Sequence, residues 1–251
     1  MNTASTLSSI GLPTQVRACL FDLDGVLTKT AVVHAQAWTE MFDAFLEGRT
    51  DGDTRPFTQA DYNEHVDGKP RADGVRDFLA SRGIELPEGE ADDPADAETV
   101  IGLGTRKNDL VQRVIARDGV EAYPGSIGYL QTVRAAGIPT AVVSASANCL
   151  QVIRAAGIEG YLEHRVDGET AARDGLKGKP APDTFLAAAK EMGVLPSAAA
   201  VFEDAVSGVQ AGARGGFCWV VGVDRVDHRA ALVHGGADQV VEDLIDLLPG
   251  S

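Results

Sequence analysis

The stretch Arg17-Ala18-Cys19-Leu20-Phe21-Asp22-Leu23-Asp24-Gly25-Val26 (RACLFDLDGV, residues 17–26) decides the fold of this chain. Its first half is a compact apolar run that stops at two carboxylates, a pattern typical of a buried strand that ends in a loop. Two later apolar runs, 138–143 and 198–202, also stop at polar residues, which are Ser144-Ala145-Ser146 and Glu203-Asp204. Three predicted strands therefore carry polar side chains directly after their carboxyl ends.

Helical patterns fill the segments between these strands. The expected helices cover 126–136, 149–156, 183–192 and 205–213, and several of them end at a glycine. Two further strands are expected at 218–223 and 239–241, with a short helix at 244–248. Alternation of strands and helices predicts an α/β fold, a doubly wound parallel sheet of five or six strands with a Rossmann-like core.

The stretch 35–117 lacks this alternation and opens with an amphipathic helix through Trp38, Met41, Phe42 and Phe45. We therefore expect an inserted helical cap at 35–117, a discontinuous catalytic core at 17–34 and 118–251, and a polar tail at 1–16. Seven acidic residues lie within 85–98 with no intervening Lys or Arg. A solvated loop is the favoured interpretation of that acidic segment.

Composition limits the classes of function. A length of 251 residues suits two units, and a net charge of −15 argues against a nucleic-acid partner. The three cysteines are widely spaced and form no CxxC pair, which favours free thiols and a cytoplasmic location. The N-terminal residues do not fit a signal peptide, and no apolar run approaches the roughly 20 residues that cross a bilayer. We therefore expect neither export nor a membrane partner.

Asp22 and Asp24 are the first candidate site residues. Side chains two positions apart in an extended segment point the same way, so both carboxylates are expected at the carboxyl edge of the sheet, where ligands bind in open parallel sheets. Two like charges this close need a cation, and Mg²⁺ prefers oxygen ligands. An Asx turn that closes the loop is an equally weighted alternative for this pattern alone.

The other sheet-edge residues each have a structural alternative. Glu203 and Asp204 precede a helix and fit a helix cap; Ser144 fits a cap as well; and Lys179 fits a solvated surface charge. Taken together, however, these residues supply carboxylates, a hydroxyl and a cation at one edge. Coincidence is the weaker hypothesis for the whole set.

These four motifs, Asp22 to Val26, Ser144, Lys179 and Glu203-Asp204, resemble the haloacid dehalogenase-like superfamily over nearly the whole chain from Arg17 onward. The resemblance implies that Asp22 attacks phosphorus and becomes an aspartyl phosphate, and that Asp24 is the general acid/base. It also implies Mg²⁺ held by Asp22, the Asp24 carbonyl, Asp204 and Glu203, with Ser144 and Lys179 on the transferred phosphoryl group.

Several further stretches resemble the β-phosphoglucomutase family within that superfamily. They are Thr28-Lys29-Thr30-Ala31 with His34 and Trp38, Gly68 to Asp73, Arg106 to Asp109, Tyr123 to Gly125, Ser144 to Asn148, and Lys179 to Asp183. The resemblance implies interconversion of β-D-glucose 1-phosphate and glucose 6-phosphate through β-glucose 1,6-bisphosphate, an activating intermediate. Small hexose phosphates are then the expected partners of a monomeric enzyme.

The same resemblance implies substrate contacts. Arg71, with Gly68 beside it, would bind the distal phosphate, since a guanidinium suits that group. Lys107 would contact sugar or phosphate, and Ser146 and Asn148 the other phosphate. The alternatives are a surface ion pair for Arg71, solvation for Lys107 and helix capping for Ser146 and Asn148. For Trp38, a further substrate-contact candidate, and for His34, simple packing is the favoured interpretation.

Three positions depart from the family pattern: Lys29 replaces an acid, Ala147 a lysine and Ala205 a serine. The aspartyl chemistry does not need them, but they bear on the finer phosphate contacts. A sugar-phosphate phosphatase with the same core is therefore the main alternative. A sugar-phosphate sensor without catalysis is a weaker alternative, because Asp22 and Asp24 are both present.

Overall fold

The structure is a computed structural model that describes residues 10–249. The chain forms two compact units: Met1–Lys29 with Val120–Ser251, called the core unit here, and Thr30–Gly119, called the cap unit. The sequence predicted the insert at 35–117. The structural division lies at Thr30 because helix α2 (Thr30–Leu46) begins there.

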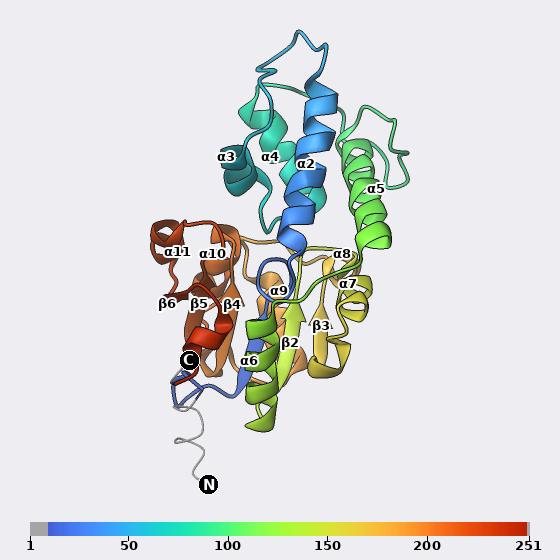
Figure 1. The fold of residues 1–251 in the computed structure, drawn as a ribbon. Helices are drawn as coiled ribbons and strands as arrows, with labels where there is room; N and C mark the ends of the chain where they lie inside the picture. Colours follow the sequence, from blue (N-terminus) through green and yellow to red (C-terminus); the bar gives the residue numbers. More distant parts are fainter. Residues whose placement is uncertain (1–9, 250–251) are drawn as a thin grey trace. The chain divides into compact units, whose positions relative to one another are not determined.

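A six-stranded parallel sheet in the order β3-β2-β1-β4-β5-β6 forms the centre of the core unit (Figure 1). Its strands are β1 (Ala18–Phe21), β2 (Thr140–Val143), β3 (His164–Val166), β4 (Ala199–Glu203), β5 (Trp219–Val223) and β6 (Gln239–Val241). The strand order reverses between β1 and β4, and ligands of open α/β sheets bind outside the carboxyl ends at such a point.

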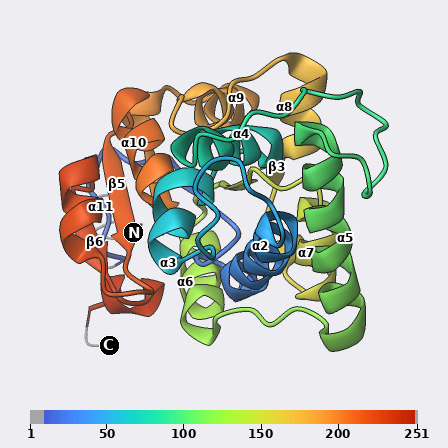
Figure 2. The same cartoon turned by 90° about the horizontal axis from the view of Figure 1, so that it is seen from above.

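Helices cover both faces of this sheet. Figure 2 shows α6 (Pro124–Ala135) and α7 (Cys149–Ala155) on one face, with α9 (Asp183–Glu191) and α10 (Val206–Arg214) on the other. The remaining core helices are α8 (Gly168–Asp174) and α11 (Arg229–Gly235). The predicted doubly wound parallel sheet is therefore confirmed.

The sequence prediction missed one strand of this sheet. Edge strand β3 contains His164 and Arg165, which are partly exposed and interrupt the apolar pattern. The expected C-terminal helix is a shorter 3₁₀ turn, Leu244–Leu247.

Aromatic packing joins β1 to β4 beneath the sheet edge. Phe21 stacks on Phe202 with ring centroids 4.4 Å apart, and Tyr129 of α6 meets Phe202 edge-on at 5.6 Å. All three side chains are fully buried. Each aromatic pair contributes about 0.5–1.5 kcal/mol beyond its buried area, so this cluster stabilises the place from which the first two carboxylates extend.

The cap unit is helical. It contains α2, α3 (Gln59–Asp61), a π-helical turn (Tyr62–Val66), α4 (Arg71–Ser81) and α5 (Val100–Asp118). The predicted amphipathic helix is confirmed, since α2 buries Trp38, Met41, Phe42 and Phe45. Phe42 lies at its centre, with ring centroids 4.0 Å from Phe78 and 5.3 Å from Trp38.

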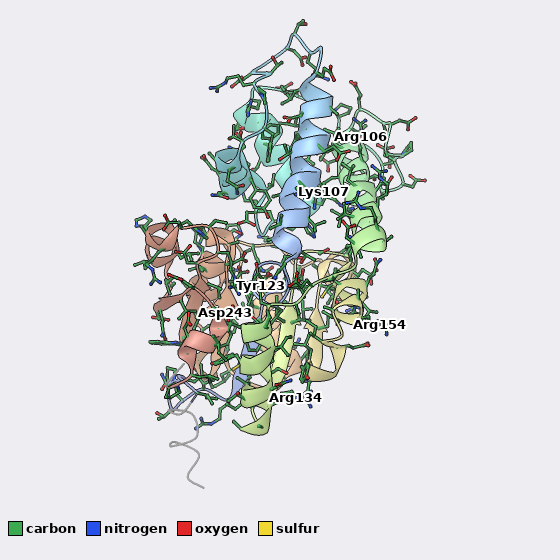
Figure 3. The ribbon with its side chains drawn as sticks, in the orientation of Figure 1. Arg106, Lys107, Tyr123, Arg134, Arg154 and Asp243 are labelled. Atoms are coloured by element: carbon green, nitrogen blue, oxygen red, sulfur yellow. The ribbon has the colours of Figure 1, made fainter. Side chains whose placement is uncertain are left out.

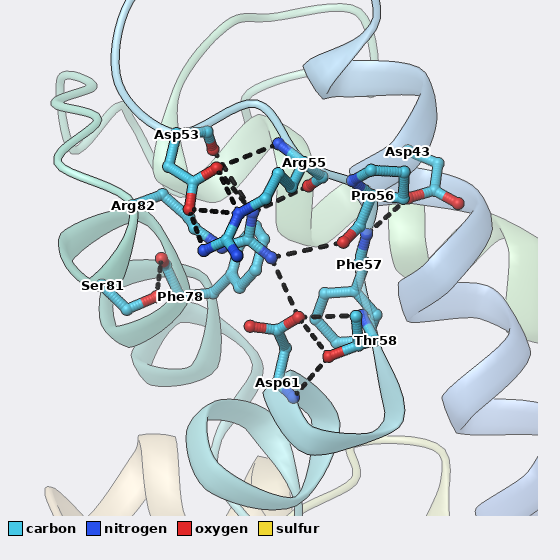
Figure 4. Close-up of polar contacts among 10 residues, drawn as sticks. All are labelled: Asp43, Asp53, Arg55, Pro56, Phe57, Thr58, Asp61, Phe78, Ser81 and Arg82. Atoms are coloured by element: carbon cyan, nitrogen blue, oxygen red, sulfur yellow. Dashed lines mark hydrogen bonds and ion pairs between the residues drawn. The ribbon is translucent and has the colours of Figure 1, made fainter.

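An arginine fixes the irregular segment that leads from α2 to α3 in the cap unit (Figure 4). Arg82, which is 7% exposed, donates to the carbonyl of Arg55 at 2.7 Å and to the Asp61 carboxylate at 2.9 Å. Its guanidinium also lies 4.8 Å from the ring centre of Phe78. The acidic segment 85–98, which the structure describes in full, forms no helix or strand, as expected.

Between residues 10 and 249, none of the helices has both the length and the apolar character needed to cross a membrane.

Candidate active site

The loop after β1 turns sharply at Gly25, and this turn brings it against Asp204. Gly25 has φ +89°, in the left-handed region that favours glycine. A Cβ at this position would lie 1.7 Å from Asp204 Oδ2, so no other residue fits without moving the carboxylate. The Gly25 amide donates to the carbonyl of Thr28 at 2.8 Å, which closes the turn.

Parallel pairing places the two acidic motifs side by side. Phe21 pairs with Phe202, and the Asp22 amide donates to the Phe202 carbonyl at 2.9 Å. Carboxylate oxygens of Asp22, Glu203 and Asp204 consequently all lie within 4.8 Å of one another, and the three residues are buried. The expected proximity of the two acidic motifs is confirmed.

Lys179 lies within this carboxylate group. It is 3% exposed and forms ion pairs with Asp22 and Glu203. Burial raises the pKa of Asp22 well above its usual range, and Glu203 and Asp24 add to this effect while Lys179 opposes it. Burial alone would lower the pKa of Lys179, but the two carboxylates outweigh it and raise that pKa. The surface-charge alternative for Lys179 is therefore wrong.

The donor set fits a hard divalent cation. Three buried carboxylates offer oxygens within 4.8 Å of one another, and like charges this close favour a bound cation. Carboxylate oxygens at this spacing are the ligands that Mg²⁺ prefers. The Asp24 side chain is not a member of this group of three.

Ser144 joins the end of β2 to the same edge. It is 1% exposed, and its hydroxyl lies 3.4 Å from Asp24 Oδ2. Ser144 Oγ accepts from the Ser146 amide at 3.1 Å, and Ser146 Oγ accepts from the Asn148 amide at 3.1 Å. Asn148 occupies the N-cap of α7, but its own side chain forms no capping hydrogen bond there. The capping alternative is therefore wrong for Asn148, whereas the two serine hydroxyls do accept main-chain amides just before α7.

Glu203 also supports the start of α10. Its Oε2 accepts from the Ala205 amide at 3.0 Å, although Ala205 itself is the N-cap residue. A Cβ at Gly208 would lie 1.8 Å from Glu203 Oε1, so α10 packs directly on this carboxylate. Glu203 thus has both the structural contact considered from sequence and the contact with Lys179.

The cap-unit candidates form a separate group. Lys107 is 5% exposed; its Nζ lies 2.7 Å from His34 Nδ1 and 4.8 Å from the ring centre of Trp38. Lys107 belongs to α5 and is labelled in Figure 3. Because an ammonium group only donates, His34 Nδ1 accepts. Solvation of Lys107, the alternative from sequence, is wrong, and the expected packing of Trp38 is confirmed.

Arg71 is the first residue of α4, and Gly68 lies in the turn before it. A Cβ at Gly104 would lie 3.4 Å from Arg71 Cγ, so the arginine stem passes along α5. Burial lowers the pKa of Arg71, with Asp109 opposing the shift. Arg71 is therefore a partly buried cation with the Asp109 carboxylate near enough to affect its charge.

Sequence reasoning missed two side chains of the core unit that touch this site. Arg225 donates to the carbonyl of Gly25 at 2.9 Å, and His228 Nε2 lies 2.9 Å from the carbonyl oxygen of Asp204. Arg225 and His228 both follow β5, a strand that the sequence predicted. The polar cluster after that strand was the available signal.

The comparisons with known proteins agree with this geometry. A family model described as haloacid dehalogenase-like hydrolase matches residues 16–216. A β-phosphoglucomutase of Mycobacterium bovis is 52% identical over 95% of this chain and 94% of its own length. A β-phosphoglucomutase of Bacillus subtilis is 31% identical over 92% of both chains.

A solved structure shows the same architecture. The β-phosphoglucomutase of Clostridium difficile has a TM-score of 0.71 and 25% sequence identity, covering 92% of this chain and 93% of its own. The resemblance stated from the motifs is therefore confirmed over nearly the whole sequence.

Proposed function

This chain belongs to the haloacid dehalogenase-like hydrolase family, and we propose that it is a Mg²⁺-dependent β-phosphoglucomutase. Its reaction would interconvert β-D-glucose 1-phosphate and glucose 6-phosphate, with β-glucose 1,6-bisphosphate as the activating intermediate. The observation that carries the proposal is the buried group of Asp22, Glu203 and Asp204, with Lys179 paired to the first two, at the point where the strand order reverses. A monomeric, cytoplasmic enzyme whose partners are hexose phosphates is part of the same proposal.

Asp22 is the proposed nucleophile. One of its oxygens attacks phosphorus, the bond from phosphorus to the sugar oxygen breaks, and an aspartyl phosphate forms. In the return step, a sugar hydroxyl attacks that phosphorus and releases the Asp22 carboxylate. The ion pair with Lys179 keeps Asp22 oriented at the end of β1 and favours its ionised form.

Asp24 is the proposed general acid/base. It protonates the leaving sugar oxygen in the first step and takes the proton from the attacking hydroxyl in the second. Such proton transfer typically contributes about 10²- to 10⁴-fold to the rate. The Asp24 carboxylate lies 3.4 Å from the Ser144 hydroxyl and is less buried than Asp22, which suits a group that must meet substrate.

The carboxylates of Asp22, Glu203 and Asp204, with the Asp24 carbonyl, are the proposed Mg²⁺ ligands. When bound, the ion would offset the negative charge that builds up on the phosphoryl oxygens. Lys179 and Ser144 would bind those oxygens from the protein side. Electrostatic stabilisation and positioning of this kind provide most of the catalysis in phosphoryl transfer.

The remaining residues are proposed to bind the sugar and the phosphate that is not transferred. They are Trp38, Gly68, Arg71, Lys107, Ser146 and Asn148. A mutase must keep water from its aspartyl phosphate, since hydrolysis would make it a phosphatase, and excluding solvent is the role we propose for the cap unit.

The test is to supply β-glucose 1-phosphate with Mg²⁺ and a trace of β-glucose 1,6-bisphosphate, and to follow both products. Formation of glucose 6-phosphate supports the mutase. Release of free phosphate at a comparable rate would instead identify a sugar-phosphate phosphatase, the alternative that Ala147 and Ala205 favour. No turnover of either kind would contradict both enzymes and favour a sensor.

A further inference from the structure

The loop between β5 and α11, residues 224–228 and called the β5 loop here, contacts both acidic motifs through main-chain carbonyls. Arg225 Nε donates to the carbonyl of Gly25, the residue after Asp24, at 2.9 Å. His228 Nε2 lies 2.9 Å from the carbonyl oxygen of Asp204. Because a carbonyl oxygen can only accept, His228 Nε2 carries the proton. Two side chains of one loop thus hold the backbones of both motifs.

Arg225 is itself firmly held. Its Nη1 donates to the carbonyl of Glu242 at 2.7 Å and to Asp243 Oδ2 at 3.0 Å. The guanidinium carbon lies 3.7 Å from the ring centre of Tyr123; Figure 3 labels Tyr123 and Asp243 on the core unit. A planar guanidinium can donate to several separated acceptors while it stacks flat on a ring, whereas a lysine ammonium is a compact point charge.

His228 is held from the start of the same loop. Asp224 Oδ1 accepts from the His228 amide at 2.9 Å and lies 3.2 Å from His228 Nδ1. The Asp224 amide in turn donates to the Val241 carbonyl at 2.7 Å, which ties the loop to β6. These hydrogen bonds hold the β5 loop in place, so it can fix the positions of the two motifs that it contacts.

The loop after β1 and the loop after β4, which the β5 loop contacts, meet at the Asp204 carboxylate. The space in which a Gly25 Cβ would lie is 1.7 Å from Asp204 Oδ2, so the Gly25 peptide is packed on the Asp204 carboxylate. A shift of either loop would change how Asp204 lies relative to Asp22 within their 4.8 Å group. Mg²⁺ tolerates little departure from its preferred geometry.

We propose that Arg225 and His228 are positioning residues that set the spacing between the loop after β1 and the Asp204 carboxylate, and so determine the affinity of the site for Mg²⁺. This inference rests on the proposed function. Residues that orient metal ligands without touching the metal typically cost about 10- to 100-fold in metal affinity when they are changed.

The test is calorimetric titration of the metal-free protein with Mg²⁺ alone, which needs no turnover. For Arg225→Lys, which keeps the charge but loses the planar fork, we expect binding weaker by about 10- to 100-fold. His228→Leu should weaken binding in the same direction. His228→Gln, whose side-chain amide still donates, should restore part of the lost affinity.

Arg229→Ala is the matched control. Arg229 follows the β5 loop directly, and its side chain also donates to a main-chain carbonyl, that of Val240 at 2.8 Å, but not to either motif. Its Mg²⁺ affinity should equal that of the wild type. Thermal unfolding of each variant without Mg²⁺ checks that the variant is folded. Arg225→Lys is the variant that decides the test.

Equal Mg²⁺ binding by wild type and folded Arg225→Lys would overturn this inference and leave the proposed function intact. A wild-type protein that binds no Mg²⁺ would overturn the proposed function and the inference with it. Equal weakening in Arg229→Ala and Arg225→Lys would also overturn the inference, because a general disturbance of the region would then explain both.

Discussion

The core and cap units bury charge of opposite sign in different ways. At the sheet edge, three carboxylates from the ends of β1 and β4 lie within 4.8 Å of one another, and two of them pair with Lys179, so this group fits a cation. In the cap unit, the partly buried charge is a cation, Arg71, at the start of α4. Under the proposed function, the core unit would hold the reacting phosphoryl group and the cap unit would recognise charge on the substrate.

The largest expected effect is at the nucleophile. Asp22→Asn removes the attacking oxygen charge but keeps the shape, so turnover should fall by on the order of 10⁴-fold or more. Steady-state assay of the mutase reaction measures this loss. Asp174→Asn, which changes an exposed carboxylate of α8 paired with Arg173, is the control. An Asp22→Asn enzyme with most of its turnover would contradict the assignment.

Removing the Lys179 ammonium, which pairs with Asp22 and Glu203, should lower the free energy of unfolding. Lys179→Met leaves Asp22 and Glu203 buried without their shared partner, which costs about 3–5 kcal/mol of unfolding free energy. Urea denaturation without Mg²⁺ measures the loss, and added Mg²⁺ should recover part of it. Lys190→Met, in the last turn of α9, should cost far less. Equal free energies of unfolding for the two variants would argue against Lys179 stabilising the buried carboxylates of Asp22 and Glu203.

Changing Arg71 in the cap unit should weaken recognition of the substrate more than it slows the chemical step. Arg71→Ala should lower mutase kcat/KM by about 10- to 100-fold, the equivalent of the 1.5–3 kcal/mol typical of a charged hydrogen bond. Hydrolysis of a small aryl phosphate, which lacks a second phosphate, should fall much less. Arg76→Ala, on the same helix but paired with Asp73 and Glu88, is the control. Equal losses in both reactions would exclude a distal-phosphate contact for Arg71.

The smallest expected effect is a pH dependence confined to the cap unit. Hydrogen bonds from Arg55 lower the pKa of Asp53 to about 2. A lowered folded-state pKa gives stability that is present above the unfolded value near 3.8 and is lost as pH falls toward 2. Asp53→Asn should therefore be less stable than wild type at pH 6, with the difference shrinking below pH 4. A difference in unfolding free energy that stays constant down to pH 2 would contradict this assignment.

The fold and the sheet-edge residues were predictable because they follow from chain-local patterns. Apolar runs mark β1, β2 and β4, and parallel strands bring whatever follows their carboxyl ends to one edge. Asp22, Ser144 and Glu203 therefore come together without any knowledge of the loops. β3 was missed because its polar residues hide the pattern of a short edge strand.

Contacts made by long side chains across the chain were not predictable. Lys107 meets His34 across 73 residues, at a distance set by how α2 and α5 pack. Arg225 binds a main-chain carbonyl at Gly25, an acceptor that every residue offers and that sequence therefore does not mark. Only the polar cluster at the end of a predicted strand, Asp224-Arg225, pointed to this loop.

The most direct test of the central claim is a crystal structure of the protein with Mg²⁺ and beryllium fluoride, which mimics a phosphoryl group on a carboxylate. Our account predicts beryllium bonded to a side-chain oxygen of Asp22, with Lys179 and Ser144 on the fluorides. Beryllium attached to another side chain, or absent from a crystal that holds Mg²⁺, would contradict it.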